Sequence, residues 1–290
     1  MANGSATSLR SGGFKLFSVV GIDVFLHWSW ILVAAYEVQQ NRAYKSPVFA
    51  GVEYLALFLI VLMHEFGHAL ACRSVGGIAN RIILWPLGGV AFVQPPMRPG
   101  AWLWSIAAGP LVNVLLVPVT FGLLFVIHAS GDARHLMVRI TTINVVLLIF
   151  NLLPIYPLDG GKILQSLLWF MVGQARSLMI AATLGIIFAV AGVGALLALS
   201  GGDVGGNIWL VLIGAFAVTQ SVNGLKYAKA LSKLMALPRN ENYHCPACRQ
   251  APPAVPAWRC QCGNVLDIFD AQGVCASCGT KWESVRCVFC

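Results

Sequence analysis

The sequence predicts an all-α polytopic membrane protein with about six transmembrane helices, a small membrane-associated β hairpin or sheet, and a small β-rich domain at its C-terminus. Three observations predict this fold. Hydrophobic residues make up 58% of the 290 residues and charged residues only 10%, against about 25% charged in an ordinary soluble domain. The mean hydropathy is +0.77. All cysteines except Cys72 lie at or after Cys245, which sets that end of the chain apart.

The apolar segments are long enough to predict six spans, since a helix needs about 20 apolar residues to cross the hydrocarbon core. They lie at 25–40, 50–72, 102–128, 136–155, 177–199 and 206–228. The first is short. The stretch before it, FKLFSVVGIDVFLHW, alternates and is rich in Val, Ile and Phe, which favours an extended segment against the membrane face.

Two segments between the spans predict other structures. RIILW and GVAFVQ, which flank Pro-Leu-Gly-Gly, are typical of a β hairpin and too short to span. Residues 157–176 predict a short helix or a re-entrant piece. The chain is then expected to divide into a flexible N-terminus (1–13), a transmembrane domain (14–235), a polar linker (236–244) and a cysteine-rich domain (245–290).

The net charge of +8 is explained by membrane topology. If the N-terminus is cytoplasmic, most Lys and Arg residues lie in loops on that side, and only Arg42, Lys45, Arg134 and Arg139 lie on the other. Positive residues concentrate on the cytoplasmic side of membrane proteins. We therefore expect a multi-pass protein of the cell (inner) membrane with both termini cytoplasmic, in contact with lipid, and the charge does not favour a nucleic-acid partner.

The motif HEFGH lies inside the second apolar segment. On a helix, the spacing of His64 and His68 puts both imidazoles on one face, where they can bind one zinc ion. Glu65 can then take a proton from a zinc-bound water. The alternative is that the histidines pack in the bundle and Glu65 pairs with an arginine. Ionisable groups in membrane helices are costly, and this favours a functional site.

A catalytic zinc normally has three protein ligands, so a third is needed. Asp159, in NLLPIYPLDGGK at the end of the fourth segment, matches the depth of HEFGH under this topology. Glu53 lies at the opposite end of its helix, and Asp23 precedes the first span. Taken alone, Asp159 is also explained as a helix cap or turn residue.

HEFGH, AAGPLVN (107–113) and NLLPIYPLDGG (151–161) together resemble the site-2 protease family of intramembrane zinc metalloproteases. GIDVFLHWSW and WPLGGVAF resemble it as well, so the resemblance covers roughly residues 14–230. It implies that His64, His68 and Asp159 bind zinc, that Glu65 is the general base, and that Asn151 lies near the substrate carbonyl or oxyanion. A helix–helix hydrogen bond is the alternative for Asn151, and we favour packing or helix bonding for Asn113 and Asn144.

The resemblance implies hydrolysis of peptide bonds in transmembrane substrates, as in regulated intramembrane proteolysis. The alternatives are a non-catalytic zinc-binding scaffold or receptor, and a metal transporter. The presence of Glu65 argues against the scaffold, since a structural site has no need of a base. The clustering of the ligands at one point argues against the transporter. Substrate identity and oligomeric state do not follow from the sequence.

The cysteines of the tail occur in four close pairs, which are typical of zinc-binding knuckles in a double zinc ribbon. Eight thiolates make two structural sites, whereas disulfides are disfavoured in a reducing compartment. The simplest pairing has one site of Cys245, Cys248, Cys260 and Cys262, and another of Cys275, Cys278, Cys287 and Cys290. Interleaved pairing is the alternative. A protein partner that docks on this tail is expected.

Overall fold

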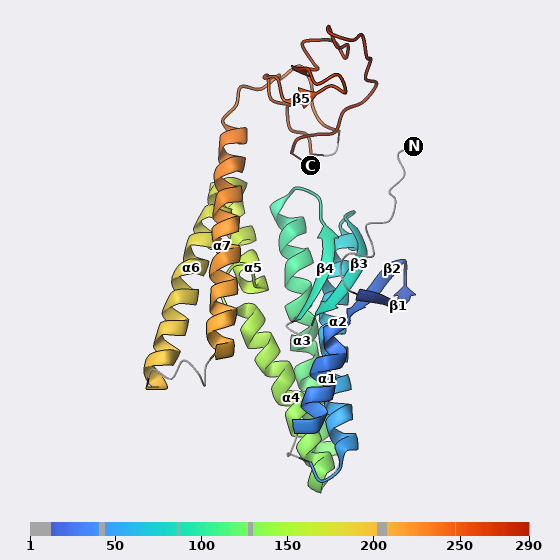
Figure 1. Ribbon diagram of the computed structural model, residues 1–290, viewed down its shortest axis with the longest axis vertical. Coiled ribbons are helices and arrows are strands. Elements are labelled where there is room, and N and C mark those ends of the chain that lie inside the picture. Colours follow the sequence, from blue (N-terminus) through green and yellow to red (C-terminus); the bar gives the residue numbers. More distant parts are fainter. Residues whose placement is uncertain are drawn as a thin grey trace.

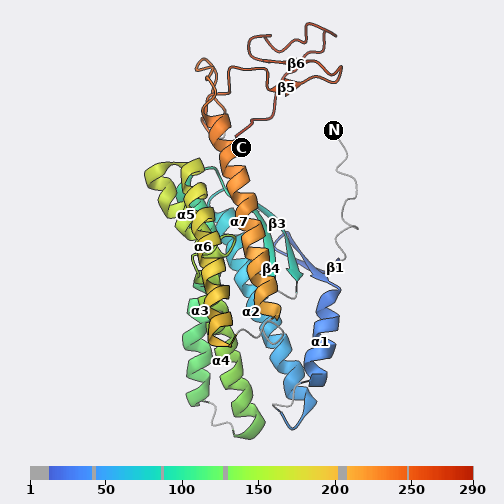
Figure 2. The same cartoon turned by 60° about the vertical axis from the view of Figure 1, so that its left-hand side comes forward.

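A computed structural model describes residues 13–40, 44–85, 88–126, 130–201, 208–246 and 248–289 of the chain. Figures 1 and 2 show an elongated bundle of helices with a small sheet on one side and the cysteine-rich tail beyond one end of the bundle. The helices are α1 (Ser29–Gln40), α2 (Pro47–Ser74), α3 (Pro99–Val126), α4 (Gly131–Leu152), α5 (Asp159–Val172), α6 (Gln174–Leu199) and α7 (Ile208–Met235).

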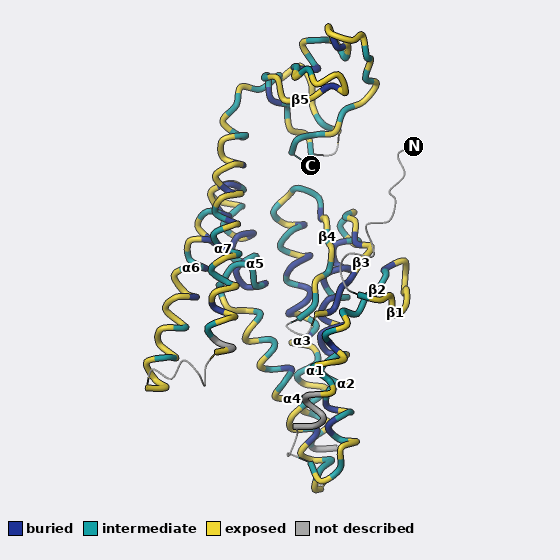
Figure 3. The backbone as a smooth tube through the Cα atoms, in the orientation of Figure 1, coloured by how far each residue is buried: buried dark blue, intermediate teal, exposed yellow. Residues whose placement is uncertain are grey.

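Four of the described helices are long and apolar enough to cross a membrane, namely Pro47–Ser74, Pro99–Leu124, Gly131–Leu152 and Gln174–Leu199. Large apolar side chains on these helices, such as Leu55, Leu115 and Ile187, are more than half exposed. Figure 3 shows exposed positions all along the helices. Large exposed apolar patches are rare on soluble monomers, and helices this apolar are suited to contact lipid. These observations confirm the prediction of an integral membrane protein.

The first predicted span, 25–40, is divided between two elements. Its first residues belong to strand β2 (Ile22–His27), and α1 has only 12 residues, about 18 Å of helix against about 30 Å of hydrocarbon. The last predicted span becomes α7, with 28 residues, which is not among the four helices above. The six predicted spans thus correspond to four described helices that are both long and apolar enough to cross a membrane, together with α1 and α7.

The sheet contains strands β1 (Gly13–Val19), β2, β3 (Ile78–Trp85) and β4 (Gly88–Gln94), in that order. β1–β2 and β3–β4 are antiparallel pairs, and β2 and β3 run parallel. This arrangement confirms the extended segment and the hairpin that the sequence predicts. The inner strands bury Ile22, Val24, Ile82 and Leu84 against α2, so the sheet is fixed to the helix that carries HEFGH, while β4 remains an edge strand.

At the opposite end of α2, a buried carboxylate ties that helix to α4. The Arg139 guanidinium donates to Glu53 Oε1 at 2.9 Å, and Tyr44 Oη donates to Glu53 Oε2 at 2.6 Å. The side chain of Glu53 is largely removed from solvent. A charge that is removed from water needs such partners, and the pairing holds α2 and α4 in register.

Residues 153–158 leave α4 and lead into α5, which confirms the short helix expected within 157–176. Helix α5 contacts both α3 and α6, and α6 packs along α7. Figure 1 shows the α6–α7 pair on the left of the bundle, with α7 leading directly into the tail.

The tail contains a two-stranded sheet of β5 (Trp258–Arg259) and β6 (Val265–Leu266). Residues of the expected linker take part in its fold, because Asn240 N donates to Pro252 O at 2.9 Å and Ala254 N donates to Pro238 O at 2.7 Å. The domain boundaries themselves stay predictions. The expected flexible N-terminus lies outside the described residues, apart from Gly13.

Candidate metal centre

His64 and His68 lie on one face of α2, one turn apart, as the HEFGH spacing predicts. Both side chains are buried, with their ring centroids 4.7 Å apart and their Nε2 atoms 3.1 Å apart. Asp159, the first residue of α5, brings its Oδ2 to 3.0 Å from His64 Nε2 and 3.1 Å from His68 Nε2. The structure therefore brings together the three residues that the sequence selects.

The other nitrogen of each ring is held by an acceptor. His64 Nδ1 lies 2.5 Å from Asn113 Oδ1, and His68 Nδ1 lies 2.9 Å from the carbonyl oxygen of Ser105. Because both partners accept hydrogen bonds, each Nδ1 carries the proton and donates it. The Nε2 atoms then present lone pairs, and these face the carboxylate oxygen of Asp159.

This donor set fits a zinc ion. The three ligand atoms lie within 4.8 Å of one another, and their separations are 3.0 to 3.1 Å. Tetrahedral ligands about 2.0 Å from zinc are separated by about 3.3 Å. Three lone pairs this close repel one another, and a bound cation or a proton relieves that repulsion. Two imidazoles and one carboxylate are also a usual protein set for a catalytic zinc.

Asn113 and Asn144 form a buried hydrogen-bonded pair that fixes the orientation of the His64 ring. Asn144 Nδ2 donates to the backbone carbonyl oxygen of Asn113 at 3.1 Å, and Asn113 Nδ2 donates to Asn144 Oδ1 at 2.7 Å. Asn113 Oδ1 is therefore turned toward His64. The expected helix bonding is present, but the contact with His64 was missed. The sequence feature that could have indicated this contact is the motif AAGPLVN, which ends at Asn113.

Gly109 is a second residue that the sequence reasoning missed. A Cβ atom at this position of α3 would lie 2.3 Å from His68 Nε2 and 2.9 Å from His64 Nε2. A contact below 3 Å is too close for non-bonded atoms. The glycine in AAGPLVN thus leaves open the space in front of the two ligand nitrogens.

Glu65 is buried and points toward the hairpin. Its Oε2 accepts a hydrogen bond from the backbone N–H of Ala91 in β4 at 2.7 Å. The carboxylate is thus held beside the histidine pair and outside the ligand cluster, which consists of His64, His68 and Asp159.

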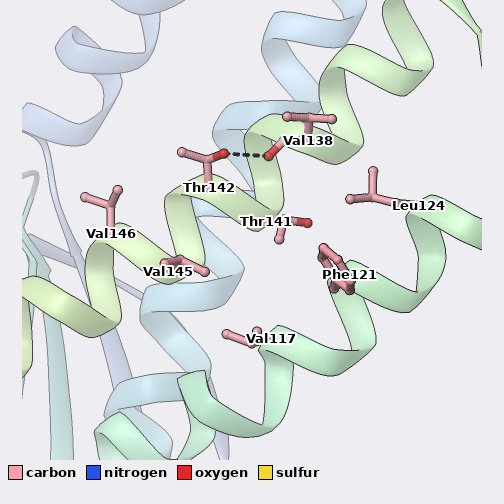
Figure 4. Close-up of a pocket in the computed structure, with 8 residues that line it drawn as sticks. All are labelled: Val117, Phe121, Leu124, Val138, Thr141, Thr142, Val145 and Val146. Carbon is pink, nitrogen blue, oxygen red and sulfur yellow. Dashed lines mark hydrogen bonds between the residues drawn. The ribbon is translucent and has the colours of Figure 1, made fainter.

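Asn151 lies in the last turn of α4 and is half-buried. Its role toward a substrate carbonyl stays a prediction. An apolar pocket of about 490 Å³ between α3 and α4 is lined by residues such as Phe121, Val138 and Val145 (Figure 4). Its lining residues include no metal-binding group, so this pocket is separate from the metal centre.

The tail cysteines gather in two clusters, and the expected pairing is wrong. One cluster contains Cys260, Cys262, Cys275 and Cys278, and the other contains Cys245, Cys248 and Cys287. The expected partner of Cys287, Cys290, lies outside the described residues. The described clusters are nested, because the chain folds back on itself: the second and third pairs of cysteines come together, and Cys287 returns to the first pair. An interleaved pairing would join the first pair with the third, so the structure differs from that alternative as well. Cys248 Sγ lies 3.7 Å from Cys287 Sγ, and Cys260 Sγ lies 3.5 Å from Cys278 Sγ.

In the first cluster, hydrogen bonds act in opposite directions on two thiols. That from the backbone of Asn264 acts to lower the pKa of Cys262, but those from Cys278 and Cys260 raise it, whereas the pKa of Cys275 is lowered. Burial acts to raise the pKa of the Cys275 thiol, but hydrogen bonds from the backbone of Ser277 and Cys278 and from Asn264 lower it to about 6. The thiolate is the form that binds metal. The geometry therefore favours a closed site of four thiolates in this cluster.

Comparisons with known proteins agree with this geometry. Residues 125–192 match the model of peptidase family M50. A zinc metalloprotease of Methanocaldococcus jannaschii is 33% identical, over 70% of this chain and 57% of its own length. The Bacillus subtilis protein YwhC is 30% identical, over 39% of this chain and 68% of its own length.

A solved structure, the site-2 protease from Methanocaldococcus jannaschii, aligns with a TM-score of 0.53 at 28% identity, covering 73% of this chain and 95% of that chain. The chain spans less than two thirds of the length of its curated relatives from Methanocaldococcus, Synechocystis and Mycobacterium.

Replacing Asn113 should weaken zinc binding at the centre. Asn113→Ala removes the acceptor that orients His64, and we expect the affinity to fall by about 10- to 100-fold, the usual effect of losing such a partner. Chelator competition on the purified protein in detergent measures this affinity. The zinc that is bound by wild type but not by His64→Ala is assigned to the centre, and only this zinc is counted. Asn223→Ala, at an exposed position of α7, is the control. An unchanged affinity in Asn113→Ala would contradict the assigned role.

Double cysteine substitutions distinguish the two pairings of the tail. Cys262→Ser with Cys278→Ser removes two ligands of one cluster and should release about one zinc per chain, whereas Cys248→Ser with Cys262→Ser should release about two. If consecutive pairs shared a zinc, the first double variant would release about two zinc ions and the second about one. Elemental analysis of the purified protein gives the answer, and Cys72→Ser, outside both clusters, should lose none.

Proposed function

Because this chain belongs to peptidase family M50, the site-2 protease family, we propose that it is an intramembrane zinc metallopeptidase that hydrolyses peptide bonds of membrane-spanning proteins. The observation that carries the proposal is the convergence of His64, His68 and Asp159 at 3.0 to 3.1 Å, with Glu65 beside them. A non-catalytic scaffold would account for the ligands but not for the neighbouring carboxylate.

In this proposal, His64 and His68 from α2 and Asp159 from α5 hold the zinc ion. When bound, zinc lowers the pKa of a water molecule and polarises the substrate carbonyl. Glu65 takes the proton from the attacking water and later passes it to the leaving amine. The side-chain amide of Asn151 donates to the negative charge that develops on the carbonyl oxygen.

The hairpin is suited to present an extended substrate. A transmembrane helix hides its carbonyl groups in internal hydrogen bonds, so cleavage requires an unwound segment. β4 is an edge strand, and the N–H of Ala91 is turned away from β3 toward Glu65. An extended substrate that paired with this edge would therefore pass directly beside the base.

The tail is proposed to hold two structural zinc ions and to dock a protein partner or substrate. A domain this small cannot bury enough apolar surface to fold on that alone, so metal would supply much of its stability. We further propose that both termini are cytoplasmic. Arg73 at the end of α2, Arg98 before α3 and Lys233 near the end of α7 agree with that orientation.

The test of catalysis is Glu65→Gln. We expect cleavage of single-span membrane peptides to fall by about 100-fold or more, since a general base contributes on this scale, while zinc content stays unchanged. Glu241→Gln, an exposed substitution in the tail, should leave cleavage intact. Equal cleavage by wild type and Glu65→Gln would contradict the mechanism, and a wild type that cleaves none of a broad panel would favour the scaffold.

A proline in β4 tests the edge. Since N–H groups alternate in direction along a strand, Val93 shares the outward direction of Ala91, two residues before it. Val93→Pro removes that donor and should impair cleavage about tenfold without changing zinc content. Val93→Ala keeps the N–H group and is the control. Full activity of Val93→Pro would exclude pairing at this edge.

A further inference from the structure

The position of Asp159 depends on the segment that precedes it. Between the end of α4 and the start of α5, the chain turns through residues 153–158. Ile155 N donates to Leu153 O at 2.7 Å, and Leu158 N donates to Ile155 O at 2.8 Å. Asp159 follows at once as the first residue of α5. Whatever holds this segment therefore also sets the direction of the Asp159 carboxylate.

The segment is held by the α6–α7 pair through Tyr156. Ser221 of α7 is fully buried, and its Oγ donates to the carbonyl oxygen of Tyr156 at 2.6 Å. This is a contact between residues 65 positions apart in the chain. The donor is buried and the carbonyl is partly buried, so loss of this hydrogen bond would leave a polar group without its partner. The hydrogen bond thus holds the backbone three residues before Asp159.

Two buried glycines make this contact sterically allowed. A Cβ at Gly224 of α7 would lie 2.8 Å from Tyr156 Cε1, so the aromatic ring rests directly on the backbone of that helix. A Cβ at Gly185 of α6 would lie 2.8 Å from Tyr156 N and 2.7 Å from Ser221 Oγ. Tyr156 thus fits into a seam between α6 and α7 that only small residues can form.

The three metal-binding side chains therefore have two separate supports. His64 and His68 are held through α3, by Asn113 and by the carbonyl of Ser105. Asp159 is held through α6 and α7, by way of Tyr156. The second support thus comes from helices that supply none of the ligands, and Figure 1 shows this α6–α7 pair on the left of the bundle.

We propose that Ser221, Gly185 and Gly224 are positioning residues that set the Asp159 carboxylate in the metal centre by holding Tyr156. This inference rests on the proposed function, because it takes Asp159 as a zinc ligand. It assigns to α6 and α7 a direct part in metal binding, although none of the ligands lies on these helices.

The test is the zinc affinity of the intact protein in detergent, measured by chelator competition. Only the zinc that Asp159→Ala loses is counted, which excludes metal bound by the tail. Gly224→Ala places a methyl group against the Tyr156 ring, and we expect an affinity about tenfold weaker, as for other supports of metal ligands. Ser221→Ala removes the hydrogen bond and should weaken binding in the same direction.

Gly214→Ala is the matched control. It is the same substitution in the same helix, and its Cβ would lie 2.3 Å from Val193 Cγ2 of α6, so it disturbs the α6–α7 packing away from Tyr156. We expect wild-type zinc affinity for this variant. In a Tyr156→Ala background, which removes the ring, Gly224→Ala should have no further effect, because the two changes act through one contact.

Three results would overturn the inference. They are wild-type affinity in both Gly224→Ala and Ser221→Ala, an equal loss in Gly214→Ala, and a full effect of Gly224→Ala in the Tyr156→Ala background. A different result identifies failure of the proposed function itself. If Asp159→Ala and His64→Ala both keep the full zinc content, the ligand set is wrong, and the positioning role falls with it.

Discussion

The structure depends on three lone pairs that face one another inside an apolar helical bundle. Two Nε2 atoms and one carboxylate oxygen lie 3.0 to 3.1 Å apart, in a region where each polar group already costs free energy to bury. A zinc ion between the three atoms would turn this cost into three favourable bonds. A metal ion at this point gives a physical reason for three other features: acceptors at both Nδ1 atoms, a glycine in front of the rings, and a carboxylate from a separate helix.

The protein must hold these groups from several directions because no single helix can present all three. An α-helix can align two side chains four residues apart, and α2 does so. The third ligand has to come from another segment, and a segment with its own turns needs its own support. The buried pair Asn113–Asn144 and the seam around Tyr156 are the two supports. Both use small or amide side chains, which let helices approach closely and satisfy their polar groups without water.

The sequence predicted the parts of this site that follow from local periodicity or from a contiguous motif. The helical spacing within HEFGH places His64 and His68 on one face, and the LDGG motif identified Asp159 as the third candidate ligand. What it did not predict are contacts between residues far apart in the chain. Asn113 was interpreted as a packing residue because nothing local points its amide at His64. Pairing of the tail cysteines failed for the same reason: spacing identifies each knuckle, but only the folded chain determines which knuckles meet. The first span was misjudged because a buried strand and a helix are both apolar.

The nested clusters of the tail bring its last described residues next to the end of α7. Since Cys287 returns to Cys245 and Cys248, the end of the tail closes against its beginning. Arg239, just after α7, lies 4.3 Å from the ring of Phe289 and donates to the carbonyl oxygen of Met235. Metal in this cluster would therefore stiffen the connection to the end of α7. The same helix holds Tyr156 through Ser221 and Gly224. The proposed partner of the tail would therefore dock next to the end of the helix that contacts Tyr156.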